Sequence, residues 1–233
     1  MSIKLKLNSD FRDYYDFAFP STAELTFDRL AGDRTMSKLD QFKLLSSLGL
    51  RVPFVALGRD MLSDTPLRSD DLVVAYIDDR AHCGEGKKLV QLTDLSVSDD
   101  ALLCSQWINT TGLMDASTSY RLLQIGSRAW LLRYEGAGGW MSNHCDDTAI
   151  FIEGECLGFH RWSNAAIDCF PLFAIDFVIP VHAPIPETID DVIRGGYAID
   201  FNIAPGMRWT GMNGLLSAIE VYSLIEAWMS REG

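Results

Sequence analysis

Two apolar segments in the second half of the chain contain the same four residues, Ala-Ile-Asp-Phe, and so place a carboxylate inside a run of strand-forming residues. Asp176 lies in the first segment and Asp200 in the second, and Asn202 follows Asp200 by two positions. Side chains alternate between the faces of an extended strand, so Asp200 and Asn202 share one face while Ile199 and Phe201 occupy the other. If the two segments pair side by side, three oxygen-bearing side chains meet in one patch.

Two interpretations of this patch are open. A carboxylate in an apolar strand is unfavourable unless a cation or hydrogen bonds compensate it. Mg²⁺ prefers carboxylate and amide oxygens and keeps waters or phosphates as its other ligands, so Asp176, Asp200 and Asn202 are candidate metal ligands. Alternatively, the acids face water on a half-exposed antiparallel sheet, which requires no metal.

The order of the expected elements favours an α+β fold. A helix is expected with Ser37 as its N-cap and Asp40 at the third helical position, ending at Gly49. Strand-like segments follow without a regular alternation of strand and helix, and a helical period returns from Leu215 to Met229. Doubly wound parallel sheets require that alternation, so antiparallel sheets are favoured. The strand-like segments are residues 50–57, 70–78, 87–95, 120–126, 128–136, 148–154, 171–180 and 196–204.

A glycine-bearing turn joins segments 70–78 and 87–95 into an expected hairpin. Gly84 and Gly86 permit a backbone whose N–H groups form an anion-binding concavity, and Lys87 and Lys88 add positive charge. Such a turn would suit a triphosphate, although a solvated hairpin turn is the simpler alternative. It is not a P-loop, because the Gly-x-x-x-x-Gly-Lys-Ser/Thr spacing is absent and a strand follows.

Arginines on the 120–136 hairpin are further candidate anion ligands. The planar guanidinium of Arg121 or Arg133 fits a phosphate through two hydrogen bonds. Ion pairs that face solvent are the more common use of such residues, so both interpretations stay open.

The charge and the apolar segments exclude other classes of partner. The net charge of −12 argues against nucleic-acid binding, because neutralising phosphates requires clustered Lys and Arg. No apolar segment reaches the roughly 20 residues that cross a bilayer. The amino terminus lacks the apolar core of a secretory signal. We therefore expect no nucleic-acid or membrane partner and a cytoplasmic location.

Read in order, these segments resemble the ATP-grasp family, whose two α+β lobes, each an antiparallel sheet with packed helices, hold ATP between them. Residues 37–53, SKLDQFKLLSSLGLRVP, are similar to the family's lysine-bearing opening helix, and the turn at 82–88 is similar to its phosphate-covering loop. Residues 102–108, LLCSQWI, resemble the interlobe segment that meets adenine. Segment 120–134 is similar to the large-lobe hairpin whose first arginine approaches phosphate. Asp176 resembles the family's metal-binding acid. Asp200, Asn202 and the Pro-Gly that follows resemble the family's acid-x-Asn-x-x-Pro-Gly ending.

The resemblance implies ATP and Mg²⁺ as cofactors and a division into an amino-terminal arm or cap at 1–35, a small lobe at 36–105 and a large lobe at 106–233. Ala75 and Tyr76 stand where the family places a strand lysine, so Lys87 or Lys88 would have to substitute. Asp200 is shorter by one methylene than the Glu that is common there, which would move the cation. The implied nucleotide-binding residues are Gly84, Gly86, Lys87, Lys88, Gln106, Trp107, Ile108 and Arg133.

The implied activity is that of an ATP- and Mg²⁺-dependent ligase joining a carboxylate to an amine through an acylphosphate, with a small-molecule or peptide acceptor. Arg121 would offset the charge of the moving phosphoryl group, and Arg208 would touch the acceptor. The alternative is a non-catalytic acidic binding or inhibitor protein on a degenerate ATP-grasp fold, which the net charge and the missing strand lysine favour. A rise in melting temperature with MgATP separates the two.

Overall fold

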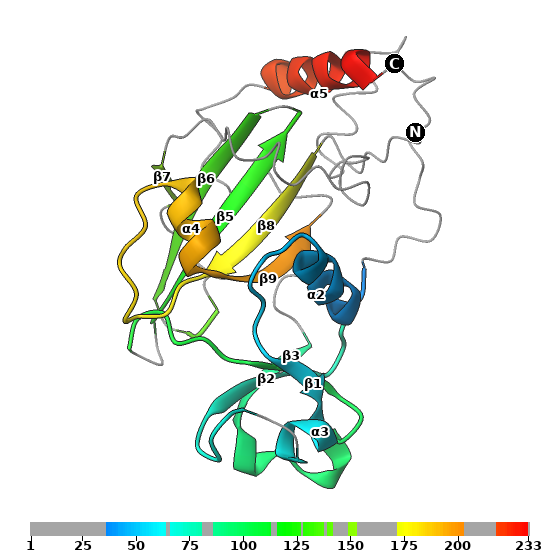
Figure 1. Ribbon diagram of the computed structural model, residues 1–233, viewed down its shortest axis with the longest axis vertical. Helices are drawn as coiled ribbons and strands as arrows, with labels where there is room; N and C mark the ends of the chain where they lie inside the picture. The colour runs from blue at the N-terminus through cyan, green and yellow to red at the C-terminus, as the bar shows by residue number, and fades with distance from the viewer. Residues whose placement is uncertain are drawn as a thin grey trace.

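The strands in the described part of the chain form two antiparallel sheets, one above the other along the long axis of Figure 1. A computed structural model describes residues 36–63, 66–80, 86–112, 116–126, 128–137, 139–141, 149–152, 172–202 and 218–232. The smaller sheet has the strand order β1-β4-β2-β3 and the larger sheet the order β7-β6-β5-β8-β9. Helices pack on both, so the predicted α+β fold with two sheet-containing lobes is confirmed.

The smaller sheet is built around the predicted hairpin, which is confirmed. Its strands are β1 (Val55–Leu57), β2 (Leu72–Tyr76), β3 (Lys87–Gln91) and β4 (Leu103–Gln106), accompanied by α3 (Gly58–Ser63) and the 3-10 turns η2 (Leu92–Asp94) and η3 (Val97–Asp99). β2 pairs with β3 so that Tyr76 is opposite Lys87 and Ala75 is opposite Lys88. Gly86 closes the hairpin with a φ of 64°, and its carbonyl oxygen accepts the Ile77 N–H at 2.7 Å.

The larger sheet brings the two Ala-Ile-Asp-Phe segments together. Its strands are β5 (Ala116–Ile125), β6 (Arg128–Ala137), β7 (Ala149–Ile152), β8 (Leu172–Val178) and β9 (Tyr197–Asn202). β8 and β9 are antiparallel neighbours, with Asp176 opposite Asp200 and Ala174 opposite Asn202. A register shift follows Asp176, at Phe177. The expected side-by-side pairing is confirmed, and opposed residues of paired strands share a face.

One face of the larger sheet carries the main core. α4 (Ile189–Gly195), which the sequence pattern did not indicate, packs on this face and begins with a capping box between Thr188 and Asp191. α5 (Ala218–Glu232) confirms the predicted carboxyl-terminal helix and buries Val221 and Ile225. None of the described helices is both long and apolar enough to cross a membrane. The core of this face includes Leu45, Leu122, Phe173, Ile175, Phe177, Val192 and Phe201.

Helix α2 (Lys38–Ser47) connects the two sheets. The predicted N-cap is confirmed, because the Ser37 hydroxyl accepts the Asp40 N–H at 3.2 Å. Phe42 meets Tyr76 in the smaller sheet's core with ring centroids 6.5 Å apart, while Leu45 is fully buried in the core of the larger sheet. Figure 1 shows α2 beside β9, so a helix assigned to the small lobe from sequence also packs on the large one.

The turn from α4 into β9 generates a stability prediction. A methyl group at Gly196 would lie 2.6 Å from the Val192 carbonyl oxygen and 3.4 Å from the Phe177 side chain, whereas one at Gly195 would meet no atom within 4 Å. Gly196→Ala should therefore lower the free energy of unfolding by about 1–3 kcal/mol. Gly195→Ala is the matched control and should lose no stability. Urea unfolding measures both, and equal stabilities of the two variants would contradict the packing described for this turn.

Candidate functional site

Four charged side chains form a continuous row on the larger sheet and α2, in the order Arg121, Asp176, Asp200 and Lys38; we call it the charged row. Arg121 on β5 is opposite Asp176 on β8 and donates two hydrogen bonds to its carboxylate, Nε to Oδ1 at 2.7 Å and Nη2 to Oδ2 at 2.8 Å. Lys38 donates to the Asp200 carboxylate. The two acids are directly opposed, and each is neutralised by a cation on its outer side. The charges along the row therefore run plus, minus, minus, plus, with the two acids between the two cations.

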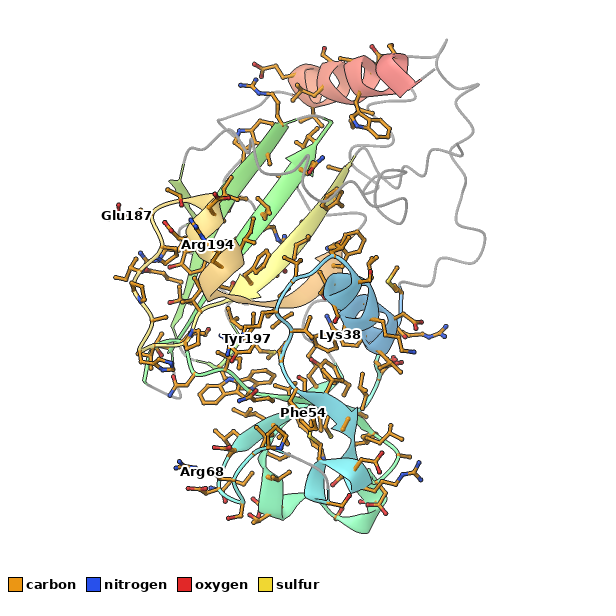
Figure 2. The ribbon with its side chains drawn as sticks, viewed as in Figure 1. Lys38, Phe54, Arg68, Glu187, Arg194 and Tyr197 are labelled. Carbon is orange, nitrogen blue, oxygen red and sulfur yellow. The ribbon has the colours of Figure 1, made fainter. Side chains whose placement is uncertain are left out.

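Lys38 is buried at the start of α2, at the level where that helix approaches the smaller sheet (Figure 2). Besides its ion pair with Asp200, its ammonium donates to Gln41 Oε1 at 3.0 Å and to the Ile199 carbonyl at 3.2 Å. An ammonium has three donors, so all three are used. Gln41 Oε1 also accepts the Phe201 N–H at 3.1 Å, so α2 satisfies backbone groups along the outer edge of β9.

The pKa values in the charged row show that the ion pairs dominate over burial. Burial is the largest single influence on Asp200 and opposes its charge, but the attraction and hydrogen bond of Lys38, together with Lys87 and Arg121, outweigh burial and lower the pKa of the Asp200 carboxyl. Burial likewise opposes the charge of Lys38 and of Arg121, yet their carboxylate partners raise the pKa of both. Asp200 keeps 31% of its side chain exposed against 5% for Lys38, so this carboxylate stays accessible to a ligand.

The two hairpin lysines point to opposite sides of the smaller sheet. The Lys87 ammonium lies 5.8 Å from the centre of the Tyr76 ring and contributes to lowering the pKa of Asp200, so it faces the charged row. Lys88 instead donates to Asp99 at 2.6 Å on the other side. Of the two lysines predicted to substitute for the missing strand lysine, Lys87 alone lies where it could do so, and Lys88 is a structural partner of η3.

The two hairpin arginines also lie on opposite faces of their sheet. Arg133 is opposite Tyr120, the residue before Arg121, so its side chain lies on the face away from the charged row. It pairs there with Glu135. The two candidate anion ligands Arg121 and Arg133 therefore lie on opposite faces of the sheet. The ring of Tyr134 instead lies 5.5 Å from the Arg121 guanidinium, and burial raises the pKa of this phenol to about 12.

The predicted interlobe segment does connect the two sheets. Trp107 N–H donates to the Leu72 carbonyl at 3.0 Å within the smaller sheet, and the Asn109 carbonyl accepts the Val181 N–H at 2.9 Å from the loop after β8. Ile108, which lies between Trp107 and Asn109 in the sequence, is buried. An open cavity of about 260 Å³ lies at this junction, lined by Asp70, Asp71, Leu72, Gln106, Trp107 and Asn109.

The donor chemistry of the charged row fits a hard divalent cation. Asp176 and Asp200 are opposed, and Asn202 follows on the same face of β9. Each carboxylate oxygen has two lone pairs, so the hydrogen bonds from Arg121 leave Asp176 with acceptor capacity. Among the described residues no three His, Cys, Asp or Glu side chains cluster, so such a cation would need the amide and non-protein ligands. Two predicted site residues, Gly84 and Arg208, lie outside the described residues.

Sequence comparison and structure comparison give different results for this chain. No protein-family model matches the sequence, and no match is found among curated proteins. The ATP-grasp ligase PsnB, solved with a minimal precursor, is similar over 83% of this chain with a TM-score of 0.52 at 14% identity. The RiPP-associated ATP-grasp ligase of Chryseobacterium gregarium, solved with ADP and a leader and core peptide, is similar over 97% of this chain and 72% of its own, with a TM-score of 0.50 at 14% identity.

These similarities define the class of fold. The chain has an ATP-grasp-like fold, as the order of its motifs implied, and it spans about 60% of the length of PsnB. At 14% identity the likeness concerns the fold, and the site must be argued from the chain's own residues.

The Lys88 to Asp99 pair generates a pH prediction. The hydrogen bond from Lys88, followed by the Ser96 N–H, lowers the pKa of Asp99 from 3.8 to about 2. Because the unfolded chain then binds the proton more tightly, the stabilisation is present above about pH 4 and is lost as the pH falls towards about 2. Asp99→Asn should flatten this part of the pH profile of the unfolding free energy. Identical slopes for wild type and variant in urea titrations between these pH values would show that the pair contributes nothing.

Proposed function

We propose that the protein is an ATP- and Mg²⁺-dependent ligase that joins a carboxylate to an amine, with the nucleotide held between the two sheets. The observation that carries the proposal is the charged row facing Lys87. Two opposed carboxylates, an adjacent amide and three cations, from five separate elements, converge at the junction of the lobes. Phosphoryl transfer depends chiefly on positioning and on charge stabilisation, which such a set supplies.

Asp176, Asp200 and Asn202 would hold the metal ion, because their oxygens share one face of β8 and β9. When bound, Mg²⁺ neutralises phosphate charge and orients the phosphates for in-line transfer. Lys87, on the opposing hairpin, would contact the phosphates from the smaller sheet, and Gly86 lies at the base of the same turn.

Arg121 would stabilise the charge that develops during transfer, since its guanidinium stays protonated beside Asp176. The terminal phosphoryl group passes to a carboxylate oxygen of the substrate, giving ADP and an acylphosphate. An amine then attacks the acyl carbon, inorganic phosphate leaves, and the amine loses a proton as the amide forms. Arg208 is proposed to contact the acceptor because it follows the metal-binding strand in sequence.

The adenine end of the nucleotide is proposed to lie at the junction of the sheets, near Gln106, Trp107 and Ile108. This proposal is supported by the open cavity at the junction, because one indole, two carboxylates and backbone groups line it. Carboxylates and backbone carbonyls accept hydrogen bonds from an exocyclic amine, and the indole offers a stacking surface.

A peptide is the acceptor class that we propose. This proposal is supported by two structurally similar ligases, PsnB, solved with a minimal precursor, and the Chryseobacterium gregarium ligase, solved with a leader and core peptide. The competing function is a non-catalytic acidic binding protein on the same fold. One observation favours it: both predicted metal-binding carboxylates are already neutralised by Lys38 and Arg121.

Nucleotide binding is tested by a matched pair of lysine variants. Millimolar MgATP should raise the melting temperature of the wild type, because a ligand that binds only the folded state stabilises it. Lys87→Met should reduce this rise, since Lys87 faces the charged row, whereas Lys88→Met should lower stability and leave the rise intact. Asp200→Ala should abolish it. A wild type that shows no rise at all would refute the ATP site.

Catalysis is tested with MgATP and a panel of peptides that contain both acidic residues and lysine. The ligase should form ADP only when a peptide is present, and the peptide should lose one water as an amide forms, which mass spectrometry detects. Arg121→Lys should slow ADP formation by at least about tenfold, because lysine cannot reproduce the bidentate contact. Retained MgATP binding with no ADP formation across the panel would support the non-catalytic protein instead.

A further inference from the structure

The ammonium of Lys38 already occupies the position of a cation in the charged row. It is almost fully buried and is surrounded by oxygens of Asp200, Gln41 and Ile199. One of these groups, the Asp200 carboxylate, is also a ligand of the metal ion under the proposed function. A tethered ammonium and a divalent cation therefore compete for the same carboxylate.

A free metal ion meets an obstacle at this carboxylate. The attraction between Asp200 and a cation is reduced because Lys38 neutralises it, and the ammonium is held close by the covalent backbone of α2. Displacing the ammonium would leave a buried charge without a partner, which is strongly unfavourable. Another anion must therefore form an ion pair with the Lys38 ammonium before this ammonium leaves Asp200.

The phosphates of a nucleotide are suited to form this ion pair with Lys38. Lys87 on the opposing hairpin and Lys38 both act on Asp200, so an anion between these two ammonium groups would be attracted by both. The Lys38 N–H also donates to the Asp79 carbonyl at 2.8 Å, which ties the start of α2 to the segment after β2. The first turn of α2 therefore lies between the phosphate-facing hairpin and the metal-binding strand.

We infer that Lys38 is a placeholder for the metal ion, which makes cation binding at Asp200 conditional on a bound nucleotide. This inference rests on the proposed function and goes beyond it. Metal alone does not bind appreciably; nucleotide phosphates attract the ammonium away from Asp200, and the metal ion then binds the released carboxylate together with the phosphates. Divalent cations then do not bind Asp200 in the absence of nucleotide.

Binding of Mn²⁺ without nucleotide tests the inference, with free Mn²⁺ measured by electron paramagnetic resonance. Lys38→Met should bind Mn²⁺ at least about tenfold more tightly than wild type, because the competing charge is gone. Lys38→Arg should restore weak binding, since it restores the charge. Lys43→Met is the matched control, because Lys43 is an exposed lysine on the same helix, and it should behave as wild type. Equal Mn²⁺ affinity of wild type and Lys38→Met would overturn the inference.

A second measurement uses the unchanged protein and does not depend on the folding of a variant. In a sample with ¹⁵N-labelled lysine, the buried, hydrogen-bonded Lys38 ammonium should shift on addition of ADP without metal and stay unchanged with Mg²⁺ alone. A shift with Mg²⁺ alone would overturn the inference. If free Mn²⁺ falls further with ADP and protein together than with ADP alone, the proposed nucleotide site stands whatever the fate of the inference; if the two samples are equal, both fall.

Discussion

The opposition of Asp176 and Asp200 across β8 and β9 is the constraint on which the rest of the structure depends. Like charges directly opposed in a sheet repel, and water cannot fully screen them where the strands are otherwise apolar. The fold resolves this repulsion with Arg121 from β5 and Lys38 from α2, which approach from opposite sides. Both acids are thereby neutralised within the fold.

Helix α2 connects this electrostatic constraint to the architecture. Its apolar residues enter the cores of both sheets, and its polar residues Lys38 and Gln41 hydrogen-bond along the edge of β9. The acidic strand is therefore positioned by the same element that connects the two lobes. The first turn of this helix contacts both the segment after β2, through the Lys38 N–H and the Asp79 carbonyl, and Asp200 on β9, through the Lys38 ammonium.

Much of the fold could be predicted from local patterns, because strand periodicity and turn residues are properties of short segments. Side-by-side pairing of the two Ala-Ile-Asp-Phe segments, considered from the sequence, is confirmed by the structure, and the N-cap at Ser37 was predicted from its spacing to Asp40. Helix α4 escaped prediction because seven residues give too little periodicity. The start of α4 could have been recognised from the capping-box spacing, in which Asp191 follows Thr188 by three positions.

The composition of the site was harder to predict, because the spacing of residues along the sequence does not indicate which distant segments make contact. Lys38 and Asp200 are separated by 162 positions, and no local signal connects them. The strand alternation could have assigned Arg133 to the opposite face from Arg121, and Lys88 to the opposite face from Lys87. The roles of Asp176, Asp200 and Asn202 as metal ligands, and of Gly84 and Arg208, stay predictions.

The central claim is that a nucleotide and a divalent cation meet at the charged row. The most direct measurement is a crystal structure with a nonhydrolysable ATP analogue and Mn²⁺, located by its anomalous scattering. The account predicts a peak between the Asp176 and Asp200 carboxylates, with phosphate oxygens completing the coordination and Lys87 facing them. Nucleotide bound elsewhere, or a cleft with both acids still paired to Arg121 and Lys38 at saturating ligand, would contradict it.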